Sequence, residues 1–485
     1  MPPFFSELRK FKLDELLFLI GELTRLMFDE DKPVRNIPFE RRHGLLKQSG
    51  RVTVTAWNLH DMAYLSICET NDFRGRRPTE HDLVNLCNEF LIYDDSRSAG
   101  EFRDLKHDDW VLKFAVGFSQ KQFWYQERYR LREQFNREVE LLEFIPQEVG
   151  SRLDLNAAIY EKTGFNLREF RKLLFGLFTI GMINSDLTTF SFNGSLSKLD
   201  PCLTAYNVKS VLDLYVSDYH EYRQSPLKEN HLFLKPIVRT SSNRLISVSQ
   251  YLLARKIVDG PFWIVRDYYC SCNSQSFTNE FGLLYERYVE KLLQHFLPFG
   301  GYFKIAAVPN EKRADWIIDT DNFRIIVEQK STLATLGLRT AYPDVETIHK
   351  YLESFKEAVI QLDITERAYY APGKKHIKLV LHYETLFISD GAIRPAVIET
   401  VKDHLSSLEG FFFLDIGEFE HLVQILSENS TVGEAILLEK LRVEQEHSAV
   451  GKEFSQIIPN FYKKSNQYVD KIINHYDSFW SFRIK

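Results

Sequence analysis

The sequence predicts a multidomain protein, with an all-α N-terminal region, then an α/β domain, then a short helical C-terminal extension. Apolar residues recur at three- and four-residue steps through most of the first half, which is typical of amphipathic helices. After about residue 300 the period shortens toward two, which is typical of strands. The 485 residues leave room for two to four domains, at roughly 150 residues per domain.

We divide the chain into four segments. Residues 1–228 form the helical region, residues 229–276 a short bridge that contains β-strands, residues 277–425 the α/β domain, and residues 426–485 the helical extension. In the helical region, Thr79 and Asp82 have the spacing of a capping box, which predicts that a helix begins there. Further helices are expected at residues 119–143, 155–163 and 167–180. In the bridge, strands are expected at residues 232–238 and 244–248.

The α/β domain is predicted to begin with a helix at residues 279–296, which Pro298 and the glycine pair at residues 300–301 end. The elements expected after it are strands at residues 302–308, 314–318 and 324–330, a helix at 344–362, a strand at 377–382, a helix at 392–408 and a strand at 411–414. The order is α-β-β-β-α-β, followed by α-β. Strands joined through helices favour parallel neighbours with helices on both faces.

Composition excludes several classes of protein. Hydrophobic residues make up 44% of the chain, so sizeable cores can form. The net charge of −6 argues against a generally basic surface, so a nucleic-acid site would have to be a local groove where metal ions supply part of the positive charge. Five cysteines do not make a disulfide framework. No signal peptide and no apolar run near ~20 residues is present, so we expect a cytoplasmic protein without a membrane partner.

Several catalytic motifs are absent from the sequence. There is no G-x-x-x-x-G-K-[ST], so we expect no ATP site in this chain. There is also no G-x-S-x-G and no H-E-x-x-H, which argues against an α/β-hydrolase elbow and against a zinc helix.

One predicted hairpin carries a chemically meaningful set of charges. Asp315 lies near the start of its first strand, and Glu328 and Lys330 lie near the end of its second, with a polar turn at residues 319–322 between them. Because side chains alternate along a strand, Glu328 and Lys330 share one face. Folding back through the turn brings Asp315 near Glu328. Two carboxylates and an ammonium group are therefore predicted to converge at one end of an apolar hairpin.

This set suits phosphodiester hydrolysis. Carboxylate oxygens are hard ligands for Mg²⁺, for which Mn²⁺ is a substitute, and Mg²⁺ also accepts phosphate oxygens. The ion polarises the phosphoryl group and lowers the pKa of a bound water. Lys330 would lie beside the attacked phosphate, where it could orient the water or offset charge that develops in the transition state.

Residues 277–415 resemble the PD-(D/E)xK, or restriction-endonuclease-like, nucleases. The resemblance rests on Asp315, on the run Glu328-Gln329-Lys330 and on the αβββαβ order. It implies that Asp315, Glu328 and the backbone carbonyl of Gln329 ligate Mg²⁺, and that Lys330 is the catalytic lysine.

Two further positions bear on this resemblance. In that superfamily a glutamate on the preceding helix often joins the metal site, and Glu286 is the matching residue. The residue before Asp315 is Ala314, where the motif name has proline, which weakens the resemblance more than the chemistry.

The resemblance implies a metal-dependent endodeoxyribonuclease of a prokaryotic restriction or phage-defence type, with DNA as the favoured nucleic acid. It also implies a homodimer or higher oligomer. The main alternative is a catalytically inactive nuclease fold that serves as a nucleic-acid-binding or protein-interaction scaffold. In a third interpretation, residues 1–225 form a protein-interaction module and the C-terminal half pairs subunits.

Other basic residues are weaker candidates for nucleic-acid contacts. They are Arg313, Lys356, Arg74, Arg76, Arg77, Arg130 and Arg137. Arg130 and Arg137 are seven residues apart on one helix face, but interspersed glutamates favour a salt-bridged surface helix over an aromatic core. For Lys356 and Gln361, on the helix after the third strand, we favour a solvated helix face over a role at the site.

Overall fold

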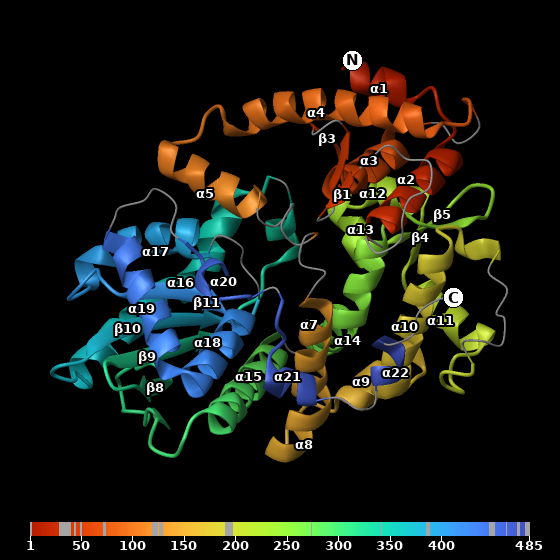
Figure 1. Cartoon of the computed structure of the whole chain (residues 1–485). Coiled ribbons are helices and arrows are strands. Elements are labelled where there is room, and N and C mark those ends of the chain that lie inside the picture. The colour runs from red at the N-terminus through yellow and green to blue at the C-terminus, as the bar shows by residue number, and fades with distance from the viewer. Residues whose placement is uncertain are drawn as a thin grey trace.

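The protein folds into a mainly helical N-terminal region and an α/β domain, which long helices connect. The computed structural model describes residues 2–28, 40–42, 45–48, 51–70, 74–118, 125, 130–189, 197–272, 274–340, 342–384, 389–445, 452–461, 463–472 and 476–480. Helices α14 (Gln250–Cys272) and α15 (Ser274–Phe296) lead from the N-terminal region into the α/β domain (Figure 1). In the part of the chain that these ranges cover, no helix combines the length and apolar character that crossing a bilayer requires.

Amphipathic helices make up most of the N-terminal region, as predicted. They are α1 (Pro3–Leu8), α2 (Leu13–Phe28), α3 (Ala56–Glu69), α4 (Glu80–Phe102), α5 (His107–Phe118), α7 (Leu131–Val139), α8 (Ile145–Val149), α9 (Leu155–Thr163), α10 (Leu167–Ile183), α11 (Ala205–Leu214), α12 (Tyr219–Gln224) and α13 (His231–Leu234). The predicted capping box of Thr79 and Asp82 begins α4. The π-helical segment η3 (Glu140–Phe144) continues α7. Of the helix expected at residues 119–143, residues 119–124 and 126–129 lie outside the described residues.

The prediction that the N-terminal region is all-α is wrong. β1 (Glu40–Arg42), β2 (Leu45–Gln48) and β3 (Arg51–Thr55) form an antiparallel sheet. Three short strands between long helical stripes give only a weak period-two signal, although the run Arg-Val-Thr-Val-Thr in β3 alternates clearly.

A second small sheet crosses the predicted boundary at residue 228. β4 (Val216–Asp218) pairs in parallel with β5 (Ile237–Arg239), which pairs antiparallel with β6 (Leu245–Ser247). Asn243 adopts a φ of 62° in the turn between β5 and β6, a conformation that asparagine tolerates. The bridge thus contains two strands, but nearly half of residues 229–276 belongs to α14.

The order of elements predicted for the α/β domain is confirmed. After α15 come β7 (Tyr302–Lys304), β8 (Trp316–Asp319), β9 (Phe323–Lys330), α16 (Val345–Ala368), β10 (Lys375–His382), η7 (Ser389–Ile393), α17 (Arg394–Val401), β11 (Phe411–Asp415), α18 (Ile416–Glu428) and α19 (Ser430–Gln445). The five strands lie in the order β11-β10-β9-β8-β7. β7, β8 and β9 are antiparallel, whereas β9, β10 and β11 are parallel, because helices join these last three strands.

Apolar side chains cover both faces of this sheet. Ile326 and Val380 pack beneath α16 with Phe355. On the other face, Val327 and Leu379 join the core that contains the buried side of α15. The alternation along β9 therefore assigns even-numbered residues to the α16 face and odd-numbered residues to the α15 face.

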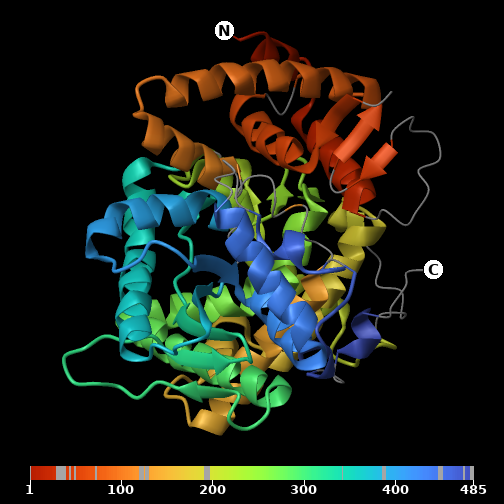
Figure 2. The same ribbon diagram turned by 60° about the vertical axis from the view of Figure 1, so that its left-hand side comes forward.

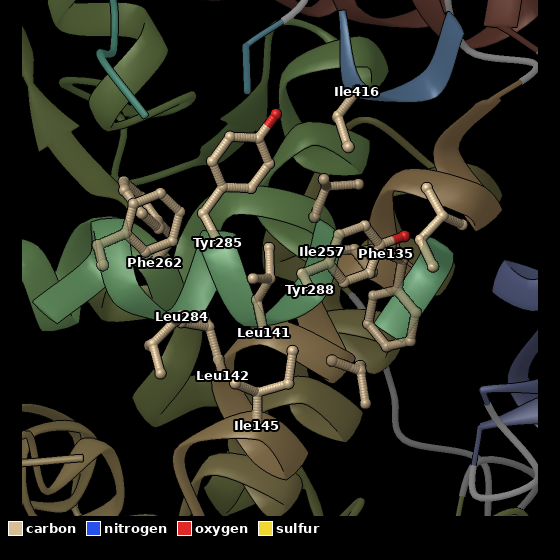
Figure 3. Close-up of a cluster of buried hydrophobic side chains, with 14 of the residues drawn as sticks. Phe135, Leu141, Leu142, Ile145, Ile257, Phe262, Leu284, Tyr285, Tyr288 and Ile416 are labelled. Atoms are coloured by element: carbon tan, nitrogen blue, oxygen red, sulfur yellow. The ribbon is translucent and has the colours of Figure 1, made fainter. Parts of the chain in front are cut away.

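One continuous core connects the two parts of the molecule. It includes Phe135 of α7, Leu141 and Leu142 of η3, and residues of α14, α15 and α18 (Figure 3). In Figure 3, Leu284 points from α15 toward Leu142, whereas Tyr285 projects to the opposite side of the helix. The N-terminal region therefore shares one core with the α15 face of the α/β domain.

Two other segments connect the parts. Helix α4 runs along the top of the molecule and α5 descends from it onto the α/β domain, where Leu112 and Val116 pack with Leu338 (Figure 2). In the C-terminal segment, α20 (Phe454–Ile457) packs against α19 and β11, whereas α21 (Gln467–Lys471) and α22 (Asp477–Trp480) pack back onto the N-terminal region. In α22, Trp480 contacts Phe135 and Phe175 with ring centroids 5.5 and 5.0 Å apart.

Candidate active site

Asp315 lies at the head of β8, directly beside the end of β9. Its backbone N–H donates to the carbonyl of Val327 over 3.0 Å, which continues the β8–β9 ladder by one residue. Its side chain then accepts a hydrogen bond from the backbone N–H of Gln329, with 2.8 Å between N and Oδ2. The turn that makes this possible is stabilised by Arg324, whose guanidinium binds both carboxylate oxygens of Asp319.

Glu328 and Lys330 lie together on the α16 face of β9. The Lys330 ammonium donates to Glu328 Oε1 over 2.6 Å and to Gln361 Oε1 of α16 over 3.0 Å. Glu328 is only 3% exposed. Within the described ranges, its second oxygen, Oε2, has no hydrogen-bond partner. A buried carboxylate oxygen without a partner is unfavourable, so a cation or a hydrogen-bond donor beside this atom would be stabilising.

The two carboxylates are electrostatically unfavourable neighbours. Burial, and then the charge of Asp315, raises the pKa of Glu328 to about 8, although Lys330 opposes the shift. Burial raises the pKa of Asp315 to about 6, against the hydrogen bond from Gln329 and the charge of Lys330. The Lys330 ammonium therefore does not compensate both buried carboxylates, and an added divalent cation would.

Glu286 approaches the site from the α15 face. It forms an ion pair with Lys304 of β7, whose ammonium lies 5.9 Å from the centroid of the Trp316 ring. Glu286 is near enough to Asp315 for its charge to contribute to the raised pKa of that residue. Glu286 thus lies beside the predicted site, but in this conformation its carboxylate is engaged by Lys304.

The residues present fit a divalent cation. Among the described residues, no three His, Cys, Asp or Glu side chains are grouped as a metal site. The expected ligands, however, are two carboxylates and one backbone carbonyl. In a strand the N–H and C=O of one residue point to the same side, so the carbonyl of Gln329 lies on the side where its N–H meets Asp315. The unpartnered Glu328 oxygen adds a further hard ligand.

The prediction that Gln361 of α16 lies on a solvated helix face is wrong. Gln361 does not lie on a solvated face, because it contacts the Lys330 ammonium. One turn later, the Thr365 hydroxyl accepts from the backbone N–H of Ala314 over 2.8 Å and donates to the carbonyl of Gln361. Thr365 thereby fixes the residue before Asp315. One signal in the sequence could have indicated these contacts. Gln361 and Thr365 are polar residues four apart, beside the apolar helix face that contains Ala358 and Leu362.

The other candidates in the α/β domain have partners of their own. Arg313 pairs with Glu311 over 2.9 Å, and its guanidinium lies 5.6 Å from the centroid of Tyr369. Lys356 pairs with Glu353 over 2.7 Å on the same helix.

The structure corrects the expectation for Arg130 and Arg137. Both are buried, at 5% and 6% exposure, so they do not form a ridge that could contact phosphates. Arg130 pairs with Glu133 over 3.1 Å. Arg137 binds both oxygens of Glu420 in α18, at 2.6 and 2.8 Å. The preferred interpretation, a salt-bridged surface helix, is also wrong in one respect, since the ion pairs lie in the interior.

In the basic loop before α4, one of three arginines stabilises the first turn of that helix. Arg76 donates to both carboxylate oxygens of Asp82, the N3 residue of the α4 capping box. Arg77 pairs with Glu15 over 3.1 Å but remains largely exposed. Arg74 is also exposed. Of the three arginines, Arg76 therefore has a structural role that its sequence position did not indicate.

Comparison of the chain with protein-family models, with curated proteins and with solved structures found no significant match.

Proposed function

We propose that this protein is a metal-dependent nuclease that hydrolyses phosphodiester bonds of nucleic acid, with DNA the favoured substrate. The supporting observation is the convergence of Asp315, Glu328 and Lys330 at one end of the β8–β9 hairpin, with a buried Glu328 oxygen that lacks a partner in the described ranges. The αβββαβ order and the mixed sheet also agree with a restriction-endonuclease-like fold.

Each residue has a defined role in this proposal. Asp315, Glu328 and the Gln329 carbonyl would hold Mg²⁺, and Glu286 could join them after release from Lys304. When bound, the ion polarises the phosphoryl group and lowers the pKa of an attacking water. The Lys330 ammonium, which Glu328 and Gln361 orient, would neutralise charge that develops on the phosphate.

The wider context is part of the same proposal. The protein would act as an endonuclease of a prokaryotic restriction or phage-defence type, in the cytoplasm and as a homodimer or higher oligomer. Because the chain carries a net charge of −6, the substrate would bind in a local groove where the metal supplies positive charge.

The decisive experiment is cleavage of supercoiled plasmid and of single-stranded DNA with Mg²⁺ or Mn²⁺. Wild type is compared with Lys330→Ala and Asp315→Ala, and with Lys402→Ala as the control, because Lys402 is an exposed lysine of the same domain that pairs with Glu399. We expect metal-dependent nicking in the wild type and in Lys402→Ala, and its loss in the other two.

Two outcomes would contradict the proposal. Equal activity in all four proteins would indicate a contaminating nuclease. No cutting, together with tight DNA binding that needs neither metal nor Lys330, would instead support the inactive scaffold.

A further inference from the structure

The backbone of Lys330 is attached to Tyr383, the first residue after β10. β9 and β10 pair in parallel with His382 opposite Lys330. One residue later, the Tyr383 N–H donates to the Lys330 carbonyl over 3.0 Å. Among the described residues this is the last hydrogen bond on that side of β9, so Tyr383 holds the backbone of Lys330 at the end of the strand.

The side chain of Tyr383 connects this position to the N-terminal region. Its ring packs against Phe281 and Tyr285 of α15, with centroids 5.0 and 5.4 Å away. Its hydroxyl donates to Glu138 of α7. Glu138 is 5% exposed, and its other oxygen has no hydrogen-bond partner among the described residues. Loss of the hydrogen bond from Tyr383 would leave this buried carboxylate without that donor, which is unfavourable. The hydrogen bond therefore holds the tyrosine hydroxyl in place.

The segment that follows Lys330 is held by the same region. The Asn230 amide donates to the Leu336 carbonyl over 2.6 Å. The Tyr342 hydroxyl donates to Asp94 of α4 over 3.0 Å. Leu338 packs with Leu112 of α5. The N-terminal region thus contacts both Tyr383, which binds the end of β9, and the segment that follows Lys330.

We propose that Glu138 and Tyr383 are positioning residues through which the N-terminal region sets the location of Lys330. The inference rests on the proposed function, since it concerns the same site. Displacement of a reacting group by about 1 Å can cost about a hundredfold in rate. A change in the seating of α7 would therefore alter the rate of cleavage without any change in the residues that bind metal or DNA.

The test compares two variants that each remove one tyrosine hydroxyl, and each of these hydroxyls binds a glutamate of the continuous segment α7–η3. Tyr383→Phe removes the bond to Glu138, and Tyr476→Phe removes a bond of 3.0 Å to Glu143 that does not lead to Lys330. We expect Tyr383→Phe to lower kcat for plasmid nicking about tenfold, with KM for DNA and the half-saturating Mg²⁺ concentration unchanged. Tyr476→Phe should leave kcat unchanged, even if its melting temperature falls equally.

Replacement of the acceptor provides a rescue experiment. Glu138→Gln keeps an oxygen that can accept from Tyr383, so its kcat should stay near that of the wild type. Glu138→Leu has no acceptor and should reproduce Tyr383→Phe. Unchanged kcat in both Tyr383→Phe and Glu138→Leu would overturn the inference, as would an equal fall in Tyr476→Phe.

Backbone hydrogen exchange separates this inference from the nuclease assignment. Faster exchange at the Tyr383 amide is expected in Tyr383→Phe and Glu138→Leu, but not in Tyr476→Phe. A wild type that does not cut DNA would remove the proposed function, and the exchange result would still decide whether this pair holds the end of β9. Unchanged exchange in all variants would overturn the inference by itself.

Discussion

Replacing Glu328 by glutamine is expected to lower plasmid nicking about a thousandfold and to make the metal-free protein more resistant to unfolding. Glu328 is buried, one of its oxygens lacks a partner in the described part of the chain, and its pKa is raised to about 8, so above its ordinary pKa its ionisation favours the unfolded state. Glutamine has the same volume without the charge, but it is a poor metal ligand. A loss of several kcal/mol of metal catalysis corresponds to about a thousandfold.

The measurement combines nicking rates with urea unfolding in EDTA and in Mg²⁺. In EDTA the Glu328→Gln variant should have the higher midpoint. Mg²⁺ at about a hundred times its dissociation constant should stabilise the wild type by about 2.7 kcal/mol and leave the variant unchanged. Glu353→Gln, an exposed glutamate of α16 that pairs with Lys356, is the control and should behave like the wild type. Equal stabilisation of Glu328→Gln by Mg²⁺ would show that Glu328 is not a ligand.

Replacing Glu420 alone by leucine is expected to lower the free energy of unfolding by about 3–5 kcal/mol. Glu420 is fully buried and accepts hydrogen bonds from Arg137 and, over 2.6 Å, from the hydroxyl of Tyr288. Its removal takes away the carboxylate that the buried Arg137 guanidinium binds through two hydrogen bonds. Because this ion pair joins α7 to α18, the loss should loosen the contact between the N-terminal region and the α/β domain.

A double variant distinguishes the buried ion pair from ordinary packing. Arg137→Met combined with Glu420→Leu should be more stable than either single variant, since neither partner of the ion pair is then left buried without the other. Arg132→Ala is the control, because Arg132 lies on the same helix and pairs with Asp477 at about half exposure. It should cost less than about 1 kcal/mol in urea unfolding. A double variant that is as unstable as the sum of the two single ones would contradict this account.

The α/β domain could be predicted because its signals are local. Pro298 and the following glycines end α15, and the alternation along residues 323–330 identifies β9 without knowledge of its neighbours. The parallel pairing of β9 and β10 followed from the helix that joins them. In contrast, β1, β2 and β3 were missed because each is at most five residues long, and their pairing with one another, more than their own pattern, makes them strands.

The same distinction applies to the site. Asp315, Glu328 and Lys330 lie within one hairpin, so the alternation of side chains and the turn at residues 319–322 were enough to bring them together. Gln361 and Thr365 belong to α16, and their contacts depend on the angle at which that helix crosses the sheet. The spacing of residues along α16 identifies its apolar face, but it does not specify the partner of a polar group at the edge of that face.

The sequence alone determined the order of the α/β elements and the three charged residues of the hairpin, because period, breakers and strand alternation act over a few residues. Only the tertiary structure decided that Arg137 is buried, since its partner Glu420 lies 283 residues away. It also decided that Glu138 meets Tyr383. Burial and charge compensation are properties of distant segments packed together, and a basic residue on a helix has the same local pattern whether it faces solvent or a buried carboxylate.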